Sequence, residues 1–142
     1  MNDKYFLDTN VIVYSFDPNF SNKQYVAQHL IRNALTGQGC ISYQVVQEFF
    51  NVAIRKFKTP LSLQDCKIYL NDVLAPLCEI FPSIEFYSQA LQMKERWQYS
   101  LYDSLIVTAS LQSNCTILYS EDMQHGQVIN QLTITNPFLD LS

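Results

Sequence analysis

The strongest restriction on the fold comes from an alternation of short apolar segments with longer helical segments along the chain. The expected strands are Tyr5 to Leu7, Cys40-Ile41, Thr116 to Tyr119 and Leu132 to Thr135. The expected helices run over about Lys23 to Leu35, Tyr43 to Lys58, Ser62 to Ala75, Pro82 to Trp97 and Asp103 to Ser113. Short strands that alternate with helices pair in parallel and are covered by helices on both faces. The sequence therefore predicts an α/β fold, a three-layer α/β/α sandwich around a central, mostly parallel sheet.

Length and charge pattern limit the organisation and the location of the protein. A chain of 142 residues is typical of one domain, so we expect a single domain over residues 1–142. The longest uncharged stretch, Ser104 to Ser120, contains eight Ser, Thr, Gln or Asn side chains, too many for a membrane span of about 20 apolar residues. The segment Met1-Asn2-Asp3-Lys4 lacks the basic head and long apolar middle of a signal peptide. We expect no membrane attachment and a cytoplasmic location.

Acidic side chains follow two of the expected strands. Asp8 comes directly after Leu7, and Ser120-Glu121-Asp122 comes directly after Tyr119. In parallel sheets the binding crevice lies beyond the carboxyl ends of the strands, so Asp8 and Asp122 are expected to face one crevice. The alternative for each is a turn or helix-capping role, which Asp often fills.

Two further acids border expected helices. Glu48 lies one step from Val52, at the edge of a broad apolar helix face, so its carboxylate is expected to be half buried. The alternative is a solvated helix rim. Asp103 begins the most apolar helix, where the helix dipole favours a negative charge with or without a further function.

The charge balance suggests what four such carboxylates would need. The chain has nine Lys and Arg against thirteen Asp and Glu, and without these four acids the two signs would be equal. The whole negative excess can therefore lie in one pocket, where mutual repulsion requires raised pKa values or bound cations. Ligands that are all oxygen select Mg²⁺ or Mn²⁺ rather than zinc. The net charge of −4 also argues against nucleic-acid binding by bulk charge alone.

Four segments together resemble the PIN-domain ribonucleases, especially the VapC-like toxins of bacterial toxin–antitoxin pairs. They are Leu7-Asp8-Thr9-Asn10, Gln47-Glu48-Phe49, Tyr102-Asp103-Ser104-Leu105-Ile106 and Leu118-Tyr119-Ser120-Glu121-Asp122-Met123. The segments occur in the family's order and span nearly the whole chain. The resemblance implies a PIN-like fold and a Mg²⁺- or Mn²⁺-dependent endoribonuclease that hydrolyses RNA phosphodiester bonds.

The resemblance also implies roles for particular residues and a set of partners. The catalytic and metal-binding carboxylates correspond to Asp8, Glu48, Asp103 and Asp122, and the supporting residues correspond to Asn10 and Ser120. The implied partners are an RNA substrate, a small antitoxin protein whose C-terminal tail occupies the site, and a second copy of the chain in a homodimer. The alternatives left open are a DNA nuclease with the same acidic site and a non-catalytic nucleic-acid-binding module.

Residues outside these motifs are more ambiguous. Arg55, Lys56 and Lys58 form the densest basic group and can either contact RNA phosphates or simply occupy a helix C-terminus, which favours cations. The tyrosines at positions 99, 102 and 119 can either stack on bases or pack in the core. The four scattered cysteines lack a C-x-x-C pair and are expected to be reduced and buried.

Overall fold

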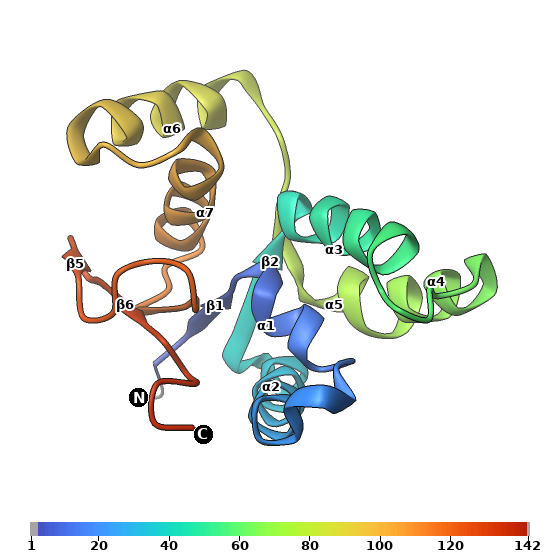
Figure 1. The fold of residues 1–142 in the computed structure, drawn as a ribbon. Coiled ribbons are helices and arrows are strands. Elements are labelled where there is room, and N and C mark those ends of the chain that lie inside the picture. The colour runs from blue at the N-terminus through green and yellow to red at the C-terminus, as the bar shows by residue number, and fades with distance from the viewer. Residues whose placement is uncertain (1–2, 142) are drawn as a thin grey trace.

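The computed structural model describes residues 3–141 and is built around a six-stranded sheet with strand order β3-β2-β1-β4-β6-β5 (Figure 1). The strands are β1 (Tyr5–Leu7), β2 (Gly39–Ser42), β3 (Cys78–Ile80), β4 (Ile117–Tyr119), β5 (Val128–Ile129) and β6 (Leu132–Thr135). All neighbouring strands pair in parallel except β5 and β6, which are antiparallel. The predicted mostly parallel sheet is confirmed.

Helices cover both faces of the sheet, which confirms the predicted α/β/α sandwich. They are α1 (Thr9–Tyr14), α2 (Ser21–Asn33), α3 (Tyr43–Arg55), α4 (Leu63–Tyr69), α5 (Ala75–Leu77), α6 (Ile84–Trp97) and α7 (Leu101–Gln112). In Figure 1, α6 and α7 lie on one side of the sheet and α1 and α2 on the other. This placement is the one that right-handed crossovers between parallel strands produce.

One α-helix and two strands were not predicted. Helix α1 follows β1 after one residue, although its sequence Thr-Asn-Val-Ile-Val-Tyr is rich in β-branched residues that favour strands. The short edge strands β3 and β5 were missed because three and two residues carry little periodic signal. The helix expected over Ser62 to Ala75 is divided into α4, a π-helical turn at Leu70–Leu74, and α5.

Helix α7 is buried along most of its length. Residues 104–110 are all buried, as its apolar sequence predicts. The hydroxyl groups buried with them donate to backbone carbonyls one turn earlier, as Thr108 does to Ser104 O (2.7 Å) and Ser110 to Ile106 O (2.8 Å). Burial of these polar groups therefore leaves no hydroxyl unpaired at those two positions.

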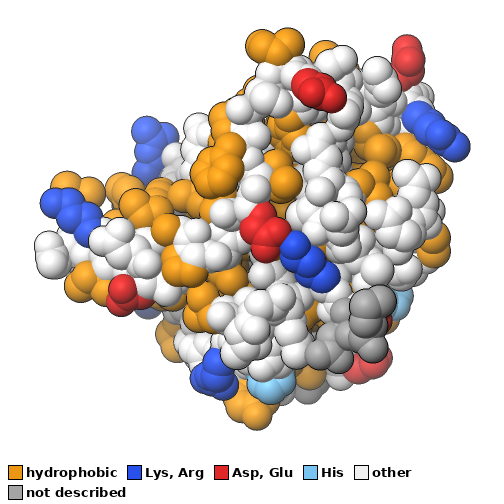
Figure 2. Space-filling view, turned by 180° about the vertical axis from the view of Figure 1, so that it is seen from behind, with side chains coloured by type: hydrophobic (Ala, Val, Ile, Leu, Met, Phe, Trp, Pro, Cys, Tyr) orange, Lys and Arg blue, Asp and Glu red, His pale blue; other side chains and the backbone are white. Residues whose placement is uncertain are grey.

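Three of the four cysteines are buried, as the sequence predicted, and the fourth is half-buried. All four cysteines are free, and Cys40, Cys66 and Cys115 are buried while Cys78 is half-buried. On the face opposite to that of Figure 1, charged side chains are few among apolar and uncharged polar ones (Figure 2). Within residues 3–141, no helix is both long enough and apolar enough to cross a membrane. Met1 and Asn2, on which the predicted cytoplasmic location partly depends, lie outside the described residues.

Candidate active site

The four acids singled out by the sequence line one cavity of about 540 Å³. Asp8 follows β1 and Asp122 lies in the loop after β4, so both are at the carboxyl edge of the sheet. Glu48 reaches the cavity from the second turn of α3, and Asp103 from the first turn of α7. Side chains far apart in the sequence are thus brought together at the edge where parallel sheets bind ligands.

Asp8 is held rigidly at the base of this cavity. Its side chain is buried, with a relative exposure of 3% for the residue, and it caps the N-terminus of α1 by accepting the Thr9 N–H at Oδ1 (2.7 Å). The hydroxyl of the fully buried Ser120 donates to the other carboxylate oxygen (2.8 Å). Asp8 therefore fills the capping role that sequence analysis allowed and also lines the cavity.

The pKa values of Asp8 and Asp103 are raised, first by burial and then by neighbouring negative charges. The pKa of Asp8 is raised to about 6, mainly by burial and to a smaller extent by the negative charges of Asp103 and Asp122, against the lowering effect of its two hydrogen bonds. Burial also raises the pKa of Asp103, which is half-buried, and Asp122 adds to this shift. The carboxylates therefore destabilise one another in the absence of a cation.

Helix α7 begins before Asp103, the residue at which the sequence analysis placed its start. Its N-cap is Ser100, whose Oγ accepts the Asp103 N–H (3.1 Å). Asp103 instead occupies the third position of the helix, where the helix dipole still favours a negative charge. The Ser-x-x-Asp spacing is a capping signal that could have placed the N-cap at Ser100 and the start of this helix two residues earlier, at Leu101.

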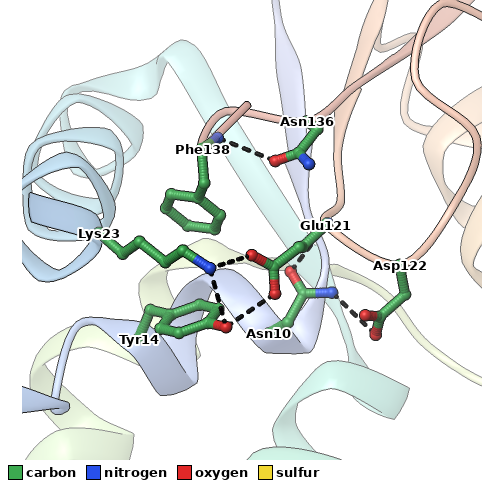
Figure 3. A network of polar contacts seen from close by, with 7 residues as sticks. All are labelled: Asn10, Tyr14, Lys23, Glu121, Asp122, Asn136 and Phe138. Carbon is green, nitrogen blue, oxygen red and sulfur yellow. Dashed lines mark hydrogen bonds and ion pairs between the residues drawn. The ribbon is translucent and has the colours of Figure 1, made fainter. Parts of the chain in front are cut away.

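Asn10 connects helix α1 to the loop that carries Asp122. Its Nδ2 donates to Asp122 Oδ2 (3.2 Å), and its Oδ1 accepts the Glu121 N–H (3.3 Å) (Figure 3). Asp122 is otherwise exposed, so this contact fixes the direction of its carboxylate.

A second group of charges beside the cavity was not predicted. Lys23, on α2, forms an ion pair with Glu121 (2.6 Å), and the Tyr14 hydroxyl donates to the same carboxylate (2.8 Å) (Figure 3). The Lys23 ammonium also lies 4.7 Å from the centre of the Tyr14 ring. The pairing neutralises the charge of Glu121, so its carboxylate is less available to a cation than that of Asp122 next to it. No local sequence signal identifies a helix-surface lysine as the partner of an acid 98 positions away.

Two more residues that line the cavity have structural partners. Asp17 accepts the Asn19 N–H (3.0 Å) and so caps a short 3-10 helical turn, Pro18–Phe20. The Tyr102 hydroxyl is hydrogen-bonded to Thr9 Oγ1 (2.6 Å). Of the three tyrosines considered from the sequence, Tyr102 lines this cavity, whereas Tyr119 packs edge-on against Tyr5.

The donor set suits a hard divalent cation. No His or Cys lines the cavity, and its predicted ligands offer carboxylate oxygens, which Mg²⁺ and Mn²⁺ prefer. Within residues 3–141, no three Asp, Glu, His or Cys side chains are already grouped tightly enough to hold an ion. The repulsion among Asp8, Asp103 and Asp122 would be relieved by a positive ion in the cavity.

The fold and this cavity define a class of α/β protein with carboxylates gathered beyond the carboxyl ends of a mostly parallel sheet. Residues 5–128 match the family model of the PIN domain. The chain therefore belongs to the PIN-domain family, which confirms the resemblance inferred from its four acidic motifs.

Solved structures with the same fold share little sequence with this chain. A toxin–antitoxin complex from Klebsiella pneumoniae has a TM-score of 0.64 at 15% identity, covering 94% of this chain and 98% of that one. VapBC2 from Rickettsia felis, bound to a promoter DNA fragment, has a TM-score of 0.59 at 19% identity, with 93% and 97% covered. VapC20 from Mycobacterium tuberculosis, a sarcin–ricin-loop-cleaving toxin, has a TM-score of 0.55 at 16% identity, with 84% and 90% covered. No curated protein matches the sequence.

Proposed function

We propose that this protein is a Mg²⁺- or Mn²⁺-dependent endoribonuclease that hydrolyses RNA phosphodiester bonds. The observation that carries this proposal is the convergence of Asp8, Glu48, Asp103 and Asp122 on one cavity at the carboxyl edge of the sheet. Carboxylates in this arrangement repel one another and also repel a phosphate. An RNA phosphate could therefore bind in this cavity only together with a cation.

In this proposal the four carboxylates hold the cation, and their neighbours hold the carboxylates. Ser120 and the Thr9 N–H keep Asp8 in one orientation, and Asn10 directs Asp122 toward the cavity. A bound divalent cation would supply Lewis-acid chemistry, lowering the pKa of water and neutralising charge on the phosphate. Asp103 or Asp122 would accept the proton of the attacking water. If the water attacks phosphorus in line with the P–O3′ bond, that bond breaks and the 3′-oxygen leaves, so the products would carry a 5′-phosphate and a 3′-hydroxyl.

We also propose that the protein is the toxin of a toxin–antitoxin pair, that it forms a homodimer, and that a small antitoxin protein inhibits it. Support comes from structural relatives that are themselves toxin–antitoxin complexes, and from VapC20, a sarcin–ricin-loop-cleaving toxin. An antitoxin segment that enters the acidic cavity would need a positive charge to be stabilised there.

Incubation of the purified protein with matched RNA and DNA hairpins in millimolar Mg²⁺ tests the proposed activity. We expect cleavage of RNA and not of DNA, complete inhibition by EDTA, and 5′-phosphate ends on the products. Cleavage of DNA alone would instead support a DNA nuclease. Binding without cleavage of either hairpin would support the non-catalytic alternative.

A further inference from the structure

A second cavity lies beside the acidic one along helix α3. It has a volume of about 400 Å³ and is lined by Gln47, Glu48, Phe50, Asn51, Ile54 and Arg55. Glu48 lines both cavities, so the two share a wall at this residue. We call the second cavity the α3 groove.

The α3 groove leads from the acidic cavity to a positive charge. Arg55 follows Glu48 by seven residues, which places the two side chains on nearly the same line of the helix, about 10 Å apart along its axis. Figure 1 shows that α3 starts beside the end of β2 and runs outward, so its last turn is far from the sheet. The groove therefore has an acidic end at Glu48 and a basic end at Arg55.

Arg55 at the basic end, and Lys56 and Lys58 that follow it in the sequence outside the groove lining, form no ion pair with a carboxylate of residues 3–141. Two ion pairs are formed among residues 3–141, and they involve Lys4 with Glu79 and Lys23 with Glu121. Arg55, Lys56 and Lys58 are exposed and belong to neither pair. Their charges are thus free to interact with an anionic ligand, in addition to the favourable effect of the helix C-terminus.

The side chains that line the α3 groove are suited to binding a nucleic-acid single strand. The side-chain amides of Gln47 and Asn51 can both donate and accept hydrogen bonds with base edges. The half-buried Phe50 and the exposed Ile54 offer apolar surface to a base, and Arg55 can bind a phosphate through two hydrogen bonds.

We propose that the α3 groove binds the single-stranded segment of the RNA substrate adjacent to the cleaved phosphate, with Arg55 and Lys56 contacting its phosphates. This inference depends on the proposed nuclease function for the placement of the cleaved bond. It explains how a chain with a net charge of −4 can hold RNA next to an acidic cavity. The binding energy comes from a local basic group, and the cation is needed only at the reacting phosphate.

Fluorescence anisotropy with a labelled single-stranded RNA of about 12 nucleotides, a length within known single-strand site sizes, tests the inference. The parent protein carries Asp8→Asn so that the RNA is not cleaved. Adding Arg55→Gln and Lys56→Gln is expected to raise Kd roughly tenfold, because two charge-assisted contacts are lost. The slope of log Kd against log salt should also fall by about 1.4, the value for two phosphates of a single strand.

Two matched variants separate this role from a general charge effect. Arg55→Lys keeps the charge and should retain most of the affinity. Arg32→Gln removes the same charge from α2, at a residue that lines neither cavity, and should leave Kd and the salt slope unchanged. Thermal unfolding of each variant verifies that the fold is retained.

An unchanged Kd and salt slope in the Arg55→Gln, Lys56→Gln protein would overturn the inference while leaving the proposed nuclease function standing. Equal, Arg55-dependent binding of single-stranded DNA would keep the groove as a strand-binding site and count against RNA as its selected ligand. If the parent protein bound neither strand, both the groove assignment and the nuclease proposal would be rejected.

Discussion

Asp8→Asn should reduce the rate of Mg²⁺-dependent RNA cleavage by about a thousandfold or more without unfolding the protein. The substitution removes a negative charge from the buried centre of the proposed cation site, and a loss of about 4 kcal/mol of transition-state stabilisation corresponds to that factor. The local hydrogen bonds can survive. The new amide oxygen can accept the Thr9 N–H, and the amide nitrogen can donate to Ser120 Oγ.

Single-turnover cleavage of a labelled RNA at saturating Mg²⁺ measures this effect. Asp72→Asn is the matched control, because Asp72 is exposed and does not line the acidic cavity. The control should cleave at the rate of the unmodified protein. Undiminished cleavage by the Asp8→Asn protein would refute the assignment of this carboxylate to the catalytic site.

The same substitution should stabilise the protein when metal is absent. The pKa of Asp8 is about 6 in the folded protein and 3.8 as an ordinary side chain, so the fold binds the proton more tightly than the unfolded chain does. The free energy of unfolding therefore falls as the pH rises from about 4 to about 6, by about 3 kcal/mol for a shift of this size. Asp8→Asn removes this penalty, so its gain should be greatest above about pH 7 and shrink as the pH approaches 4.

Urea unfolding in EDTA at about pH 8 and about pH 5 measures the gain at both ends of this range. The difference in unfolding free energy between the two proteins should be larger at the higher pH. Asp72→Asn should show no such pH-dependent gain. If the difference in unfolding free energy between the two proteins were the same at both pH values, the Asp8 carboxylate would not be destabilised by its surroundings in the fold. A variant that is less active but more stable is typical of functional sites.

Much of the fold could be predicted because its strands and longer helices have strong local signals. Tyr5–Leu7 and Leu132–Thr135 were located at their observed bounds, and the buried helix α7 was recognised from apolar side chains on all sides. Helix α1 was missed because its β-branched residues favour a strand locally, whereas the capping carboxylate of Asp8 and packing against α2 and α3 favour a helix. Tertiary contacts decide such short elements.

The acids of the cavity could be located from the sequence because strand ends and helix edges are local features. Their partners could not. The ion pair of Lys23 with Glu121 joins α2 to the loop after β4, and neither residue has a neighbour in sequence that indicates the pairing. Likewise, the continuity of the acidic cavity with the α3 groove depends on the direction in which α3 leaves the sheet. These contacts arise only from the packing of distant elements.

The proposal that the four carboxylates form a divalent-cation site is tested by titrating Mn²⁺ into the protein and measuring the free ion by electron paramagnetic resonance. We predict saturable binding of one or two ions per chain, at least about tenfold weaker in Asp8→Asn, where a charged ligand is lost, and unchanged in Asp72→Asn. Binding that does not saturate, or that is equally strong in the Asp8→Asn protein, would contradict the proposed site.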